Sequence, residues 1–310
     1  MHVRVTGLTQ IRWWVVPIVM GLALVAAAWL VGSYVAGPPK APDPMGAVMK
    51  QLEAKVRASP QNADLRVAVA DAYMREHRPA DALTQYQEAL RIDAKREDAL
   101  YGSGLAYWKL GQLERAGAAL QSVVKMNVSN PAGVLNTRVQ GAHYYLGLIL
   151  REEGRYDAAI NELRIALSLN KADADTLLEL GKTFVLVGKK SDAASAFDMA
   201  VAFVPEFPEA YVQMAKLATA MGDTAKARYA QAMTELLQGK ARGAIPTLRE
   251  VAAQGKTAHY WWGLGYALEK TGDGAGAEAA YKKAVELNPN DLLAAESLRR
   301  VQTQGARKTP

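Results

Sequence analysis

The feature that most constrains this chain is a pair of small residues that recurs at a fixed spacing. In one segment the pair is Gly181 and Ala193. Both series advance in steps of 34, 43, 34, 34 and 50 residues. Because two independent positions share one spacing pattern, the sequence predicts repeated units of about 34 residues. The residues equivalent to Gly181 are Ala70, Gly104, Gly147, Ala215 and Gly265, and those equivalent to Ala193 are Ala82, Ala116, Ala159, Ala227 and Ala277.

The segment from Ala174 to Pro205 shows the repeating unit most clearly and predicts two short amphipathic helices. Gly188 provides a turn between them without a Cβ penalty, and Pro205 cannot continue the second helix. Small residues at 181 and 193 allow the two helices to cross closely, while larger side chains fill the space around them. The other residues of the pattern are Leu177, Leu180, Phe184, Phe197 and Ala200.

This order of large, small and turn-forming residues resembles the 34-residue tetratricopeptide repeat (TPR), a helix–turn–helix unit. The resemblance implies an all-α fold: a right-handed α-solenoid of helix hairpins in which neighbouring units bury each other's apolar faces. We expect units starting near residues 63, 97, 140, 174 and 208, and a last unit at 258–291. The solenoid as a whole should cover residues 48–304, with a short helix before the first unit and a closing helix at 291–304.

Two longer steps interrupt the regular spacing. The step of 43 residues falls at 131–139, where Pro131 breaks a helix, and predicts a loop or an extension of the next helix. The step of 50 residues predicts one additional helix. Between 208 and 257 we therefore expect three helices, near 208–221, 224–238 and 241–254.

The N-terminal region predicts a membrane anchor. Trp13 to Ala36 is an apolar stretch of 24 residues without a charge, and as a helix it would span about 36 Å, enough for a ~30 Å hydrocarbon core. We expect a tail at 1–12, a transmembrane helix at 13–36 and a stiff Pro-rich spacer at 37–47. The alternative is a cleaved signal peptide, although its apolar core is normally about 7–15 residues long. Residues 305–310 are expected to be a disordered tail.

The charges that flank the apolar stretch favour one orientation in the membrane. Arg12 abuts the stretch on its N-terminal side, whereas Lys40 on the other side is soon offset by Asp43. We therefore expect a single-pass protein with a cytoplasmic N-terminus and the repeats outside the cytoplasm, in the periplasm or at the outer face. The reverse orientation is the alternative.

The sequence nominates no catalytic, cofactor or metal site. Cysteine is absent, which excludes thiolate ligands and a cysteine nucleophile. The Gly-Lys-Thr triplets at 181–183 and 255–257 lack the earlier glycine of a phosphate-binding loop. The four histidines lie far apart and show no ligand spacing. A net charge of +6 without a basic run does not predict nucleic-acid binding. We expect a non-enzyme without cofactor, metal or small-molecule substrate.

The resemblance implies a partner-binding groove lined by the first helix of each hairpin. Exposed aromatic patches tend to be interaction sites, so the expected partner is a protein or peptide that presents an apolar or amphipathic segment. The positions that carry Lys and Asn in the family's carboxylate-clamp variant are mostly Val, Tyr, Leu and Trp here, which argues against capture of an acidic C-terminus. For each candidate the alternative is packing against the next repeat. The groove candidates by the family's pattern are Tyr101, Leu105, Trp108, Tyr144, Leu148, Leu178, Lys182, Trp262, Tyr266 and Glu269.

Met49 to Leu90 is also similar to the opening of the TPR chaperones of bacterial cytochrome c maturation, in which a short helix and a Pro-containing turn precede the first repeat. Those proteins are membrane-anchored, face the periplasm and hold unfolded apocytochrome; their best-known form has two membrane helices and a shorter array. The similarity implies a scaffold or chaperone in cytochrome c maturation or in assembly of an envelope complex. The alternatives are a permanent structural subunit of a membrane complex, a non-catalytic subunit of an enzyme, or an enzyme whose chemistry lies in residues set aside above.

The predicted anchor can be tested directly. The full chain should stay with the membrane after an alkaline carbonate wash, because residues 13–36 would lie in the hydrocarbon core, whereas residues 46–310 alone should be soluble. A native N-terminus beyond residue 36 would contradict the anchor. Protease added outside intact spheroplasts should degrade the repeats, and complete protection would reverse the orientation.

Overall fold

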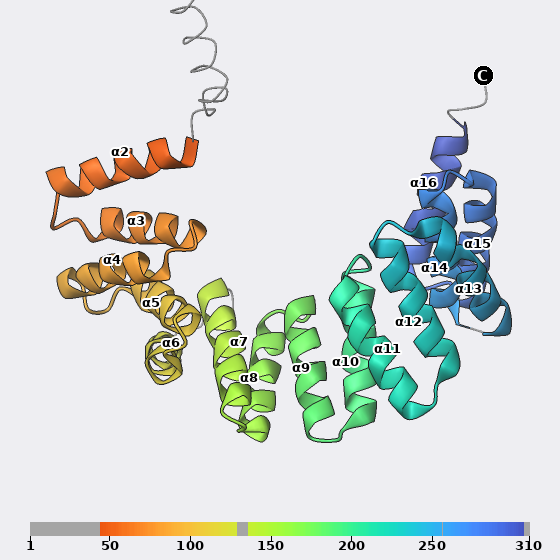
Figure 1. Ribbon diagram of the computed structural model, residues 1–310, viewed down its shortest axis with the longest axis horizontal. Helices are drawn as coiled ribbons and strands as arrows, with labels where there is room; N and C mark the ends of the chain where they lie inside the picture. The colour runs from red at the N-terminus through yellow and green to blue at the C-terminus, as the bar shows by residue number, and fades with distance from the viewer. Residues whose placement is uncertain (1–43, 129–135, 256, 307–310) are drawn as a thin grey trace, which may run out of the picture. The chain divides into compact units, whose positions relative to one another are not determined.

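A computed structural model describes residues 44–128, 136–255 and 257–306, and in these ranges every regular element is an α-helix (Figure 1). The predicted tail at 1–12, the predicted transmembrane helix at 13–36, most of the predicted spacer at 37–47 and residues 307–310 lie outside the described residues. Within the described ranges no helix combines the length and apolar character needed to span a bilayer.

The chain forms two compact units, residues 1–60 and 61–310. In the first unit, α2 (Pro44–Ala58) matches the short helix expected before the first repeat. The second unit contains the hairpins, so the expectation of an all-α array of TPR helix hairpins is confirmed. Its helices are α3 (Ala63–Arg75), α4 (Pro79–Ile92), α5 (Glu97–Lys109), α6 (Leu113–Asn127), α7 (Thr137–Glu152), α8 (Tyr156–Leu169), α9 (Ala174–Leu186), α10 (Lys190–Phe203), α11 (Pro208–Met221), α12 (Thr224–Leu237), α13 (Ala241–Gln254), α14 (Ala258–Lys270), α15 (Gly274–Leu287) and α16 (Leu292–Ala306).

Each hairpin closes over the small residues that the spacing pattern identified. A Cβ atom at Gly147 would lie 2.7 Å from Leu163 Cγ, and one at Gly265 would lie 2.6 Å from Tyr281 Cδ1. Real Cβ atoms do not approach other heavy atoms so closely, so the first helix of these hairpins presents bare backbone to its partner. The turn that follows in the central hairpin places Gly188 at a φ of 76°, a left-handed conformation that glycine adopts without strain.

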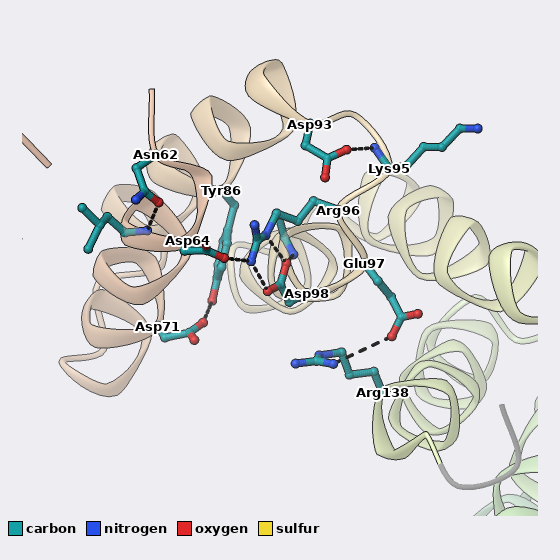
Figure 2. A network of polar contacts seen from close by, with 12 residues as sticks. Asn62, Asp64, Asp71, Tyr86, Asp93, Lys95, Arg96, Glu97, Asp98 and Arg138 are labelled. Carbon is teal, nitrogen blue, oxygen red and sulfur yellow. Dashed lines mark hydrogen bonds and ion pairs between the residues drawn. The ribbon is translucent and has the colours of Figure 1, made fainter. Parts of the chain in front are cut away.

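Polar contacts join the first two hairpins (Figure 2). Asp64 of α3 and Asp98 of α5 occupy equivalent positions 34 residues apart, and Arg96, which precedes α5, binds both carboxylates. Its Nε lies 2.9 Å from Asp98 Oδ1. Within the first hairpin, the Tyr86 hydroxyl of α4 donates a hydrogen bond to Asp71 of α3 at 2.5 Å. One guanidinium therefore offsets the repulsion between two like charges that the repeat itself brings together.

The additional helix enters the array because α12 belongs to two hairpins. Gly222 and Gly239 lie 17 residues apart at the two ends of α12, and both have a left-handed φ, of 77° and 85°. α12 contacts its hairpin partner α11 and the following helix α13. It also contacts α14, in the way that the first helix of one hairpin contacts the first helix of the next hairpin. The three helices predicted between 208 and 257 are confirmed.

The sequence carries a signal for this double role. Ala232, Gly239 and Ala244 have the same mutual spacing as Gly265, Gly272 and Ala277 of the next hairpin, and both alanines are buried. The step of 50 residues is therefore half a repeat followed by a full repeat. The apolar core is continuous across it, from Ile160 to Val301.

The close helix contact predicts opposite effects for one chemical change at two glycines. Gly181→Ala would bring a Cβ to 2.7 Å from Phe197 Cδ1, so we expect it to lower the free energy of unfolding by about 1–3 kcal/mol. Gly117→Ala in α6 meets nothing within 4 Å, so we expect a gain of about 0.5–1 kcal/mol. Chemical denaturation measures both, and equal effects of the two substitutions would contradict the close-contact explanation.

Candidate partner-binding groove

A groove of about 730 Å³ lies between the end of α10, α14 and α16. The array brings these helices together although α10 ends at residue 203 and α14 begins at residue 258. Its walls combine apolar side chains from the end of α10 with aromatic side chains from α14 and polar side chains from α14 and α16. The lining residues are Phe203, Val204, Pro205, Glu206, Trp262, Tyr266, Glu269, Lys270, Leu293, Ser297, Arg300 and Gln304.

A ladder of three aromatic rings runs along α14, and two of them, Trp262 and Tyr266, form the floor of the groove. His259 stacks on Trp262 with ring centroids 5.6 Å apart and planes 15° apart, and Trp262 stacks on Tyr266 at 5.2 Å and 10°. Positions i, i+3 and i+7 of a helix share one face, which is why these rings meet. The indole Nε1 of Trp262 donates to Ser297 Oγ at 3.1 Å. Trp262 is only 2% exposed, so its indole is held by packing on most sides and its polar atom is satisfied.

Ion pairs and hydrogen bonds fix the rim of the groove. Glu206, in the α10–α11 connection, accepts a hydrogen bond from the Tyr266 hydroxyl and lies 3.8 Å from Lys270 Nζ. On the other side Glu269 accepts two hydrogen bonds from Arg300, at 2.8 and 3.0 Å. Partial burial alone would raise the pKa of Glu269, but the hydrogen bonds from Arg300 and Tyr281 outweigh it and hold the pKa below its usual range.

A second pocket of about 450 Å³ adjoins the groove at the start of α14. Asp198, Val201 and Ala202 of α10 line it, immediately before the α10 residues that line the groove. Aromatic and polar side chains from α12 and α14 form the opposite wall, and Lys226 Nζ lies 2.6 Å from Asp198 Oδ2. His259 lines this pocket and stacks on Trp262, which lines the groove.

The sequence-predicted groove residues fall into three groups in the structure. Trp262, Tyr266 and Glu269 line the α10–α14 groove. Leu148 and Leu178 are buried, 6% and 2% exposed, where they pack in the array. The remaining candidates are half-buried on α5, α7 and α9: Tyr101, Leu105, Trp108, Tyr144 and Lys182.

The half-buried aromatic residues of α5 and α7 contact one another. Trp108 and Tyr144 each meet Tyr145 edge-on, with ring centroids 5.1 Å apart. The Tyr101 hydroxyl lies against the backbone of Gly141, where a Cβ would collide with it. Burial raises the pKa of Tyr101 to about 12, so its hydroxyl stays protonated. The role of these residues as partner contacts stays a prediction.

The sequence pattern missed the α10 side of the groove. Phe203 and Val204 are 49% and 41% exposed and line the groove. The family's pattern nominates only first helices, and these residues end a second helix. A signal was available, since an apolar pair precedes the helix-stopping Pro205. Which helix lies opposite them depends on the double role of α12.

Within the described ranges no group of three or more His, Asp or Glu side chains is placed to hold a metal ion.

The hairpin array and its groove define a helical-repeat protein of the class that serves as a scaffold for protein–protein interaction. Two family models match the chain, one described as a tetratricopeptide repeat at residues 50–131 and 229–291, the other as a TPR repeat at residues 147–188. The chain belongs to the tetratricopeptide repeat proteins. No enzyme family is among these matches, and repeats of this fold are typically non-catalytic.

Solved structures with the same fold share little sequence with the chain. The C-terminal part of a TPR protein from Cytophaga hutchinsonii is 16% identical, with 82% of this chain and 94% of that chain covered and a TM-score of 0.51. The MamA RS-1 ArsTM double mutant is 22% identical, with 57% and 94% covered and a TM-score of 0.50. YrrB, described as a TPR protein with an unusual peptide-binding site, is 16% identical, with 80% and 97% covered and a TM-score of 0.43. No curated protein matches the sequence.

The bond between Glu206 and Tyr266 predicts energetic coupling across 60 residues of sequence. In a double-mutant cycle of Glu206→Ala and Tyr266→Phe, we expect a coupling of about 1 kcal/mol, because either substitution removes the hydrogen bond to the charged group and the double variant loses it only once. Chemical denaturation of the four proteins measures it. Tyr266→Phe paired with Glu278→Ala, whose carboxylate binds Gln302 instead, should be additive. Additivity in both cycles would mean that the α10–α14 contact contributes nothing.

Proposed function

We propose that this protein is a membrane-anchored scaffold or chaperone that binds an apolar or amphipathic segment of another protein in the α10–α14 groove. One observation carries the proposal: Phe203 and Val204 stay 49% and 41% exposed beside an aromatic floor, in a groove of about 730 Å³. Exposed apolar side chains that converge on a concave site are typical of a docking surface.

The polarity of the groove supports an apolar partner. Glu206 and Glu269 are bound by Lys270, Arg300 and Tyr266 of the same chain. A partner therefore gains affinity mainly from burial of apolar area against the floor and the α10 wall. The ion-paired residues at the rim help to orient the bound segment. In the proposal, the half-buried residues Tyr101, Trp108 and Tyr144 extend the binding surface toward the N-terminal hairpins.

We place the scaffold at a membrane, with a cytoplasmic N-terminus and the repeats outside the cytoplasm. The uncharged stretch from Trp13 to Ala36 and the position of Arg12 support this placement. The process we propose is assembly of an envelope complex, and the similarity of Met49–Leu90 to the opening of cytochrome c maturation chaperones nominates that pathway. A permanent structural subunit, with the groove always filled, is the alternative.

Site-specific cross-linking tests the proposed groove. A photoreactive amino acid at position 204 of the full-length protein in native membranes should capture a defined protein, and mass spectrometry of the adduct should map to one apolar or amphipathic segment. The same probe at position 199, an exposed residue of α10 that does not line the groove, is the matched control. Equal capture from both positions would place the binding surface elsewhere. A partner that stays bound through every wash before irradiation, without exchange, would favour the permanent subunit.

Substitution of the α10 wall should separate binding from stability. Phe203→Ser should weaken binding of the captured segment, made as a peptide, about thirtyfold, which is about 2 kcal/mol for one anchor side chain. Met199→Ser, on the same helix with a similar exposure of 46%, should change affinity less than twofold. Isothermal titration measures both. Because both side chains are exposed, neither substitution should change the free energy of unfolding by more than about 0.5 kcal/mol. Equal loss of affinity in the two variants would contradict the proposal.

A further inference from the structure

His259 occupies a position between the core and the proposed groove. It stacks on Trp262, the floor of the groove, and meets the buried ring of Tyr229 edge-on with centroids 5.4 Å apart. Its Nε2 atom is buried and has no hydrogen-bond partner among the described residues. A neutral imidazole tolerates this site at the cost of one unsatisfied atom, whereas an imidazolium would leave a charged donor without an acceptor.

The groups around His259 favour the neutral ring at pH 7. Burial lowers the pKa of His259, the charges of Asp198 on α10 and Asp291 before α16 oppose the shift, and Lys226 on α12 adds to it. The other titratable groups of the adjoining pocket are Asp223, which caps α12, and the hydroxyls of Tyr229 and Tyr260.

The adjoining pocket offers the charged ring an alternative position. Its volume of about 450 Å³ is roughly three times the ~150 Å³ cavity that holds a benzene molecule. Asp198 and Asp223 both line it, and His259 is already part of its wall. A rotation of the side chain into the pocket would bring the imidazolium near the carboxylates of Asp198 and Asp223 and near solvent. Asp198 would then be shared with Lys226, and Asp223 would keep its bond to the start of α12.

We propose that His259 is a proton switch for the groove: protonation moves the ring from the face of Trp262 into the adjoining pocket, and the floor formed by Trp262 and Tyr266 then rearranges. Loss of the stacking partner frees one face of the indole, and the groove then loses affinity for an apolar segment. The inference concerns regulation of the site and rests on the proposed function, but the movement of the rings does not need a partner to be observed.

The direction of the pH dependence follows from the lowered pKa. Above the ordinary histidine value of 6.5, the ring is neutral in the folded and the unfolded chain. As the pH falls below that value, the unfolded chain and the rotated state bind the proton before the stacked state does. Protonation therefore stabilises both of them relative to the stacked state. Stability and the stacked arrangement are therefore fully present above pH 6.5 and are lost as the pH falls through the window below it.

Ring spectroscopy on the full-length protein tests the switch. The probes are 13Cε1-histidine and 5-fluorotryptophan, with signals assigned by His259→Gln and Trp262→Phe. Between pH 7.5 and 5, the 19F shift of Trp262 should move with the same midpoint as the 13C shift of His259, below 6.5. In His259→Gln this transition should disappear, and in the control His143→Gln, in a different hairpin, it should remain. Thermal melts at pH 7.5 confirm that the variants are folded.

Three outcomes overturn the proposal: a His259 midpoint at or above 6.5, a Trp262 shift that stays constant while His259 titrates, or a Trp262 transition that survives in His259→Gln. If His259→Gln fails to fold, the switch is tested by whether the His259 and Trp262 titrations of the unsubstituted protein have the same midpoint. A binding arm uses the peptide captured at position 204, whose affinity should fall at least fivefold from pH 7.5 to 5.5, and less than twofold in His259→Gln. Failure to capture any segment at 204 counts against the proposed function, while the ring titration still decides the switch.

Discussion

The array depends on the close approach of two helices at a residue that has almost no side chain. A Cβ at Gly147 or Gly265 would come within 2.7 Å of the partner helix, so any larger residue there would separate the two helices of the hairpin. Close packing lets a single large residue of the second helix, such as Leu163 or Tyr281, cover the bare backbone. Since each hairpin depends on this contact, the spacing of small residues determines where hairpins form.

The same constraint explains how the array accommodates an additional helix. Ala232 and Ala244 repeat the small-residue spacing half a period after the preceding pair, so α12 packs as the second helix of one hairpin and the first helix of the next. Gly222 and Gly239 permit the same left-handed turn at both of its ends. The packing between neighbouring helices stays the same along the array. What changes after α12 is which helices act as the first and which as the second helix of a hairpin.

The candidate groove is a product of that change. The end of α10, with Phe203 and Val204, lies opposite α14, and Glu206 binds Tyr266 across 60 residues. His259, Trp262 and Tyr266 follow helical spacing along one face of α14, so one ladder of rings connects the buried core at Tyr229 with the open groove. In the proposed switch, a change of charge at His259 acts on the floor of the groove through its stacking contact with Trp262.

The sequence by itself determined the hairpins, the turn at Gly188 and the three helices between 208 and 257, because small residues, left-handed glycines and proline act within about 34 residues of sequence. It also predicted that Trp262 and Tyr266 share one face of α14, since that follows from helical spacing. Only the tertiary structure decided that Leu178 is buried while Phe203 is exposed, and that α10 provides the opposite wall. Those facts depend on which helices face each other after α12 serves twice, and no local pattern encodes a contact between residues 60 positions apart.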